Sequence, residues 1–240
     1  MKIKLFIFLT IILSNAVGQT TLSFHPKFGA NPVELNQKIT INANESIVFE
    51  TIKCYISSLK INNELLNNPA FLYDLENQKQ LIIQSSTSFN SLSFAIGLDS
   101  ATHVSENYTG DLDPILGMYW AWNTGYTHFK ISGKKVVSGQ QDQPFELHIG
   151  GYQKPFETQQ EKTIQSNFSS QIKLDIQLLP LYEYMCKTKL FSLLIPGKEA
   201  KAIAAILPIG KEIGRFPIPI FFTNFRRRDF PGTLGINFIQ

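Results

Sequence analysis

The chain has 240 residues and a formal net charge of +3, and 43% of its residues are hydrophobic. Two of its lysines, Lys2 and Lys4, lie in the N-terminal segment described next, so the rest of the chain carries 3 − 2 = +1. A nearly neutral chain lacks the basic surface that nucleic-acid-binding proteins use, and its length suits one large β domain or two small ones.

Residues 1–18 have the pattern of a secretory signal peptide. Lys2 and Lys4 precede an apolar run at residues 5–13, and small residues follow at Ala16–Gly18, which leaves Gln19 as the expected first residue of the mature protein. The apolar run is too short to span a bilayer, and no other stretch is long enough. We therefore expect a periplasmic or secreted protein without a transmembrane segment after signal cleavage.

Most of the following chain alternates between apolar and polar residues, with many β-branched and aromatic side chains, as strands do. The expected strands are 22–25, 37–42, 46–59, 80–84, 91–97, 126–131, 144–149 and 172–178. Helical signals are few: a turn opened by Asp113-Pro114, and short helices at 181–187 and 197–205. The prediction is an all-β fold, an antiparallel β-sandwich with few short helices, formed by one domain over residues 19–205.

The composition changes after residue 205. Residues 206–240 contain four prolines, at positions 208, 217, 219 and 231, among apolar and basic residues with no clear period. We treat this segment as an atypical C-terminal extension. The two cysteines, Cys54 and Cys186, allow two interpretations, because export permits a disulfide while a strand-like position suits a buried free thiol.

Both tryptophans lie two residues apart, at Trp120 and Trp122, with Tyr119 and Tyr126 close by in the sequence. In an extended strand, residues i and i+2 share a face, so the two indoles are expected to point the same way. Two adjacent indoles form either one wall of a core or a redox-active binding surface. The sequence leaves both interpretations open.

Two of the four histidines lie at strand ends, where side chains are held rigidly next to loops. His25 ends the first mature strand, and His148 lies in a strand that runs into Gly150-Gly151. His103 falls in a polar loop, and His128 in the strand after the tryptophans. No histidine pair has the spacing of a zinc-protease helix, and no serine-hydrolase elbow is present, so an enzyme is not expected.

Several segments together resemble the MbnP family, exported copper-binding proteins named after a member encoded in methanobactin operons. In chain order they are Phe24-His25, residues 94–100, Leu112-Asp113-Pro114, residues 117–122 with Gly125-Tyr126, and residues 145–151. The Met-Tyr-Trp-Ala-Trp segment followed by His-Ile-Gly-Gly is the most specific part. The resemblance runs over roughly residues 20–205.

The resemblance implies a β-rich secreted domain that binds copper. It also implies that a tryptophan can be oxidised to kynurenine by a di-haem, MauG-like peroxidase partner, with Trp120 or Trp122 as the candidate. On the same basis His25 and His148 are the candidate copper ligands, with His128 third. Neutral imidazole suits copper, which stands high in the affinity order for nitrogen ligands.

The alternative is a secreted β-sandwich interaction or carbohydrate-binding module that uses the tryptophans and tyrosines as an aromatic platform. Copper binding requires histidines close to one another and beside a tryptophan. A sugar-binding platform requires a flat pair of exposed indoles. The positions of His25, His148, Trp120 and Trp122 therefore discriminate between the two functions.

Overall fold

The computed structural model describes residues 18–66, 70–77, 80–85, 88–122, 125–168, 170–207 and 209–211. The long strands are β1 (Gly18–Phe28), β3 (Lys38–Asn42), β4 (Glu45–Ile61), β6 (Phe71–Asp74), β7 (Leu81–Ser85), β8 (Ser91–Ile96), β10 (Gly125–Val137), β11 (Gln143–Gly150), β12 (Gln160–Gln165) and β13 (Gln171–Gln177). The short strands are β2 (Asn31–Pro32), β5 (Glu64–Leu65), β9 (Tyr119–Trp120), β14 (Ser192–Leu193) and β15 (Ile209–Lys211). The helices are α1 (Ser100–His103), α2 (Leu179–Thr188) and α3 (Lys198–Ile206), with 3₁₀ turns η1 (Gly110–Leu112) and η2 (Pro114–Leu116).

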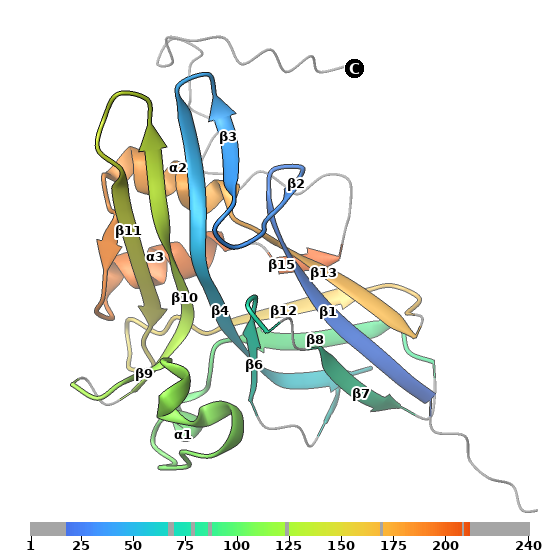
Figure 1. The fold of residues 1–240 in the computed structure, drawn as a ribbon. Helices are drawn as coiled ribbons and strands as arrows, with labels where there is room; N and C mark the ends of the chain where they lie inside the picture. The colour runs from blue at the N-terminus through green and yellow to red at the C-terminus, as the bar shows by residue number, and fades with distance from the viewer. Residues whose placement is uncertain are drawn as a thin grey trace, which may run out of the picture.

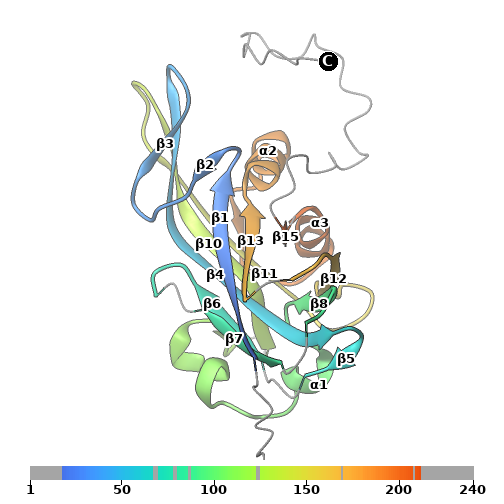
Figure 2. The same ribbon diagram turned by 90° about the vertical axis from the view of Figure 1, so that its right-hand side faces the viewer.

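The strands form two sheets in a sandwich-like arrangement, as predicted (Figures 1 and 2). The smaller sheet has the order β15-β13-β1-β2, with β7 also paired to β1. The larger sheet has the order β12-β8-β4-β10-β11-β14, with β3, β5 and β6 on β4 and β9 on β10. One core joins the sheets: Phe24 and Leu174 of the smaller sheet belong to the same buried cluster as Ile52 and Phe129 of the larger.

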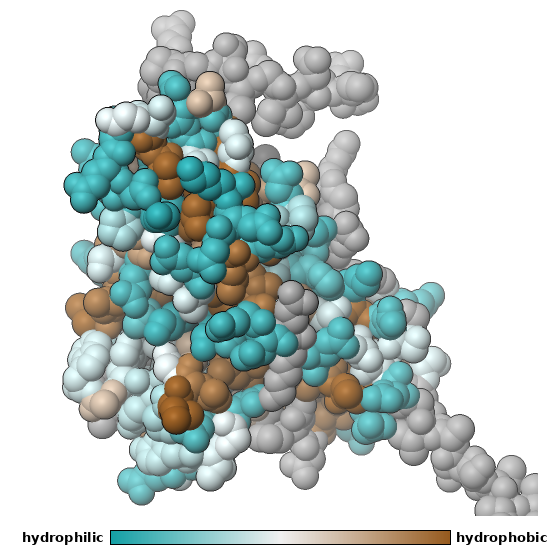
Figure 3. All heavy atoms as spheres, in the orientation of Figure 1, coloured by the Kyte–Doolittle hydropathy of each residue, from teal (hydrophilic) through white to brown (hydrophobic). Residues whose placement is uncertain are grey.

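The long strand β4 organises the larger sheet by changing partners along its length. Its first part pairs with β10, and its last part pairs with β8, with a register shift between Ser57 and Lys60 inside that pairing. Ser58 lies within that shift and has a φ of +52°, a left-handed conformation that bends the strand. On the face shown in Figure 3, hydrophilic side chains cover much of the surface and hydrophobic ones emerge between them, as strands with one wet face require.

Two strand pairs are parallel, which the expectation of an antiparallel sandwich did not include. β1 pairs with β13 in parallel, and β11 also pairs with β14 in parallel. Parallel neighbours need a long crossover connection, and nearly the whole larger sheet lies between β1 and β13 along the chain. Local sequence patterns do not report such distant partners.

The predicted helical segments are confirmed as η2, α2 and α3. The Asp113 carboxylate accepts a hydrogen bond from the Ile115 amide at 2.9 Å, the capping contact expected of an Asp-Pro start. No helix in the described ranges is long and apolar enough to cross a membrane.

The ends of the chain lie partly outside the described residues. The predicted signal peptide is outside them except for Gly18, with which β1 begins. From the predicted extension, Ile206 completes α3 and β15 pairs with β13, while residues 212–240 are outside the described part. Cys54 and Cys186 are both free thiols, Cys54 buried in β4 and Cys186 half-buried on α2.

Gly133 marks a point where β10 and β4 approach too closely for any side chain. A Cβ atom there would lie 2.0 Å from the Val48 carbonyl oxygen and 2.8 Å from the Phe145 ring. We expect Gly133→Ala to lower the free energy of unfolding by about 3 kcal/mol, measured by urea denaturation. Gly139→Asn is the control, because Gly139 has open space and asparagine tolerates its φ of +73°. Equal stability of both variants would contradict the close approach.

Candidate functional site

The two tryptophans occupy different environments although their rings are in contact. Trp120 is 5% exposed and Trp122 is 63% exposed, and their ring centroids lie 5.9 Å apart at an interplanar angle of 45°. Strand β9 ends at Trp120, so Trp122 follows the turn out of the sheet. Trp120 is thus a core residue and Trp122 a surface residue, and together they do not form a flat exposed platform.

The buried indole of Trp120 lies against His148 on β11. Its Nε1–H donates to His148 Nδ1 at 3.3 Å, and His148 Nε2 lies 2.9 Å from a carboxylate oxygen of Glu146. Because Nδ1 accepts, the neutral ring carries its hydrogen on Nε2 and donates it to Glu146. Glu146 and His148 are two residues apart on one strand and share its face. The result is a directed chain from Trp120 through His148 to Glu146.

Gly150 makes this contact possible. A Cβ atom at that position would lie 2.8 Å from Trp120 Cη2 and 2.7 Å from the Tyr126 carbonyl oxygen. Only the absence of a side chain therefore lets the edge of the indole pack against β11.

His148 is held in its neutral form. Burial lowers the pKa of its imidazole, and the positive charge of Lys130 lowers it further, while Glu146 opposes both through its charge and its hydrogen bond. A neutral imidazole keeps a lone pair, which a metal ion requires.

The Glu146→Gln variant tests the influence of this carboxylate. Without its negative charge we expect the pKa of His148 to fall further, measured by NMR titration of the ring. We also expect copper affinity to fall about tenfold, the usual effect of removing a carboxylate partner from a ligating histidine. Glu64→Gln, which changes an exposed carboxylate on β5, is the control and should alter neither quantity. An unchanged His148 pKa in Glu146→Gln would contradict the interpretation.

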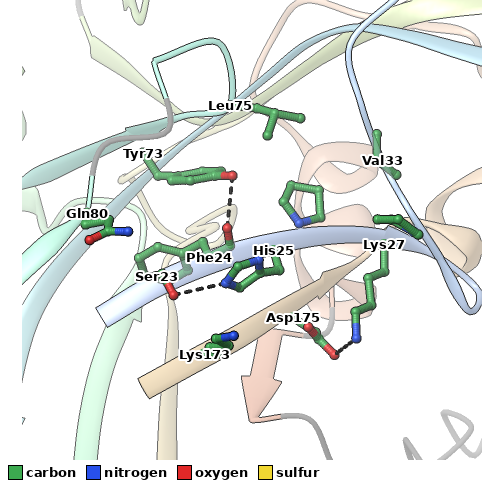
Figure 4. A pocket seen from close by; sticks show the side chains of 12 residues that line it. Ser23, Phe24, His25, Lys27, Val33, Tyr73, Leu75, Gln80, Lys173 and Asp175 are labelled. Atoms are coloured by element: carbon green, nitrogen blue, oxygen red, sulfur yellow. Dashed lines mark hydrogen bonds and ion pairs between the residues drawn. The ribbon is translucent and has the colours of Figure 1, made fainter. Parts of the chain in front are cut away.

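His25 lies in the other sheet, on β1. Its side chain is exposed, and its Nε2 lies 3.0 Å from the hydroxyl of Ser23 (Figure 4). It lines a cavity of about 350 Å³ together with Lys173 and Asp175 of β13. No hydrogen bond or ring contact in the described part of the chain joins His25 to His148. The structure therefore brings Trp120 and His148 together, but not the two histidines.

His128 is buried and paired with His103, a residue that the sequence analysis placed in a polar loop without a role. Their Nε2 atoms lie 2.7 Å apart. His103 Nδ1 accepts from the Tyr126 amide at 3.1 Å, so its hydrogen is on Nε2 and is donated to His128. His128 Nδ1 then donates to the hydroxyl of Thr158 at 2.9 Å.

Burial keeps both of these imidazoles neutral. It lowers the pKa of His103 to about 4, although the negative charge of Asp99 opposes this shift. It lowers the pKa of His128 well below its usual range, and the neighbouring His103 lowers it further. Every ring nitrogen of the pair has a partner within the protein, so a metal ion at His128 would have to displace His103 or Thr158. One sequence signal for His103 exists: Asp99 precedes Thr102 with N-cap spacing, and its carboxylate accepts from the Thr102 amide at 2.7 Å.

The donor set beside Trp120 consists of one imidazole and one carboxylate. Indole Nε1 carries a hydrogen and has no lone pair to offer, so unmodified Trp120 is not a ligand. Within the described ranges, no three or more His, Cys, Asp and Glu residues gather closely enough to hold a metal ion. Copper at this place would need a further donor.

Comparison with known proteins adds two findings. The family model described as MbnP matches residues 17–187. Among solved structures, MbnP from Methylosinus trichosporium is similar, with a TM-score of 0.52 and 11% sequence identity over 70% of this chain and 78% of that chain. At that identity the likeness concerns the fold. No curated protein matches the chain.

Proposed function

The chain belongs to the MbnP family, and from this premise we propose that it is an exported copper-binding protein, not an enzyme, whose site is centred on His148 beside Trp120. Export is supported by the signal-peptide pattern of residues 1–18, which the family match overlaps by only two residues. The protein would then meet copper in the periplasm or outside the cell.

The observation that carries the proposal is the 3.3 Å contact between Trp120 Nε1 and His148 Nδ1. Oxidative opening of an indole to kynurenine turns Nε1 into an aryl amine, which has a lone pair. In Trp120 this nitrogen already lies beside a neutral imidazole. Maturation would thus supply the donor that the unmodified chain lacks, and copper would be held by His148 Nδ1 and the new amine, while Glu146 would stay bonded to His148 Nε2 as an outer partner.

The proposed maturation uses a di-haem, MauG-like peroxidase as partner and hydrogen peroxide as oxidant. The bond between Cγ and Cδ1 of the indole breaks, and each of these carbons gains an oxygen. Hydrolysis then releases Cδ1 as formic acid. Overall, one tryptophan side chain and two molecules of hydrogen peroxide give kynurenine, formic acid and water. Trp120 is the target because it contacts His148, whereas Trp122 makes no hydrogen bond to a histidine in the described residues.

Protein purified from its native host tests the proposal. Peptide mass mapping should show one oxygen gained and one carbon lost at Trp120, and the same sample should contain copper. If the tryptophans are unmodified and the sample contains stoichiometric copper, the copper-binding part of the proposal stands and the maturation of Trp120 is contradicted. Absence of copper even after reconstitution would overturn the proposed function.

That last result would favour a secreted interaction or carbohydrate-binding module. The exposed ring of Trp122 is the feature that supports this alternative, although a single ring offers less stacking surface than a flat pair. Binding to a glycan array that disappears in Trp122→Ala would establish it.

A further inference from the structure

We propose that the exposed indole of Trp122 is the residue through which electrons leave the buried Trp120 when Trp120 is oxidised. The inference rests on the proposed function, because it concerns the route by which an external oxidant reaches the residue that matures. It assigns Trp122 a role of its own that copper ligation does not require.

Trp120 is poorly accessible to an oxidant that is itself a protein. Its indole is 5% exposed, its nitrogen faces His148, and its outer ring edge packs against Gly150. A folded oxidant cannot place its redox centre in contact with such a ring. An electron that leaves Trp120 therefore has to travel through the protein, and an oxidisable residue between Trp120 and the surface shortens each transfer.

Trp122 has the position and the chemistry for this step. Its ring is 63% exposed, and its centroid lies 5.9 Å from that of Trp120, within the range of interacting aromatic pairs. Indole is among the most easily oxidised side chains, so an exposed indole in contact with a buried one offers the oxidant a partner of matching chemistry.

Each electron transfer balances as follows. A one-electron haem oxidant at the surface is reduced, and the ring of Trp122 loses one electron to it. Trp122 regains an electron from Trp120, and the Nε1 proton of Trp120 passes along its hydrogen bond to His148 Nδ1. The products are the reduced oxidant, a neutral Trp120 radical and an imidazolium ion bonded to Glu146. The described residues give Trp122 no comparable acceptor, so the oxidised state settles on Trp120.

The nearby tyrosines form a second chain of aromatic contacts, but it lacks a base that can accept the proton of an oxidised ring. Tyr108 is 42% exposed and contacts Tyr119, which contacts Tyr126 with ring centroids 5.0 Å apart. The Tyr126 hydroxyl donates to the Leu112 carbonyl at 2.9 Å, and a carbonyl is not a base that takes up a phenol proton. Tyr119 and Trp120 are adjacent in β9, so their side chains point to opposite faces of the strand. Tyr108 therefore serves as a matched control.

The test uses copper-free protein that starts at Gln19 and has not been exposed to the peroxidase. Mass spectrometry verifies that both tryptophans are unmodified. Photogenerated ruthenium(III) tris(bipyridine), a bulky one-electron oxidant, stands in for the haem oxidant. Tryptophan radicals are followed by transient absorption, and oxygenated products are assigned to Trp120 or Trp122 by peptide mass spectrometry. The proteins compared are wild type, Trp122→Phe and Tyr108→Phe. Phenylalanine at position 122 keeps an aromatic ring but is far harder to oxidise, and an exposed site tolerates the change.

We expect oxidation at Trp120 in the wild type and in Tyr108→Phe, and its loss to background in Trp122→Phe. Oxidation of Trp120 at the wild-type rate in Trp122→Phe would overturn the proposal, and so would wild-type oxidation that stays on Trp122 or reaches neither indole. Copper binding is measured separately on wild type and Trp122→Phe after maturation in the native host. Failure of the wild type to bind copper counts against the proposed function, while the photochemical result decides the role of Trp122.

Discussion

Replacement of His148 by alanine is expected to lower the copper affinity of the matured protein by about 100-fold or more, because it removes a ligand rather than an outer partner. The half-buried ring supplies a neutral nitrogen held between Trp120 and Glu146, and among the described residues no other imidazole is in ring or hydrogen-bond contact with Trp120. Competition against a chelator of known copper affinity measures the change. Circular dichroism of the variant verifies that the fold is retained.

His25→Ala is the informative control for this prediction. His25 is exposed, lies in the smaller sheet and does not contact His148, so its loss should leave copper affinity unchanged. The opposite pattern, with affinity lost in His25→Ala and kept in His148→Ala, would move the copper site to the cavity beside β1. The same pair of variants therefore both tests and locates the site.

The free energy of unfolding is expected to fall by about 3 kcal/mol as the pH drops from 6.5 to about 4, owing to His103 alone. In the folded protein burial lowers the pKa of this residue, while in the unfolded chain it keeps its ordinary value. Below pH 6.5 the unfolded state binds more protons, so stability is complete above that pH and is lost towards the folded pKa. His128 has its pKa lowered in the same direction and adds to the loss.

Urea denaturation at a series of pH values measures how steeply the free energy of unfolding changes with pH. The His103→Leu variant tests whether His103 causes this slope. The variant leaves the buried Tyr126 amide without its acceptor and starts from lower stability, about 1–3 kcal/mol down. The diagnostic quantity is the slope, which should become shallower in His103→Leu and stay unchanged in His25→Ala. A wild-type stability that does not vary between pH 6.5 and 4 would refute the neutral pair.

Sequence patterns predicted strands where apolar and polar residues alternate, as in β3, β8 and β11. They missed β6, whose four residues are all buried and show no alternation, and β12, whose residues are mostly polar. They also did not predict the parallel partner of β1, because pairing between distant segments leaves no local trace.

Part of the candidate site could be predicted from the sequence. Trp120 and His148 stood out through their motifs, but the choice between the tryptophans depended on where β9 ends, which no propensity indicates. Glu146 was not predicted as a site residue, although strand geometry places it on the same face as His148. His103 lay in a helix of four residues, too short for a periodic signal.

The strand β15 shows that the folding unit is longer than the family match. That match ends at residue 187, yet Ala200, Ile203 and Ile209 are buried in the core, and β15 occupies the open side of β13. A chain cut at residue 187 would uncover the backbone of Leu174 and Ile176 along a sheet edge. Unpaired edges of this kind recruit strands from other molecules, so we expect β15, by pairing with β13, to protect this edge against aggregation.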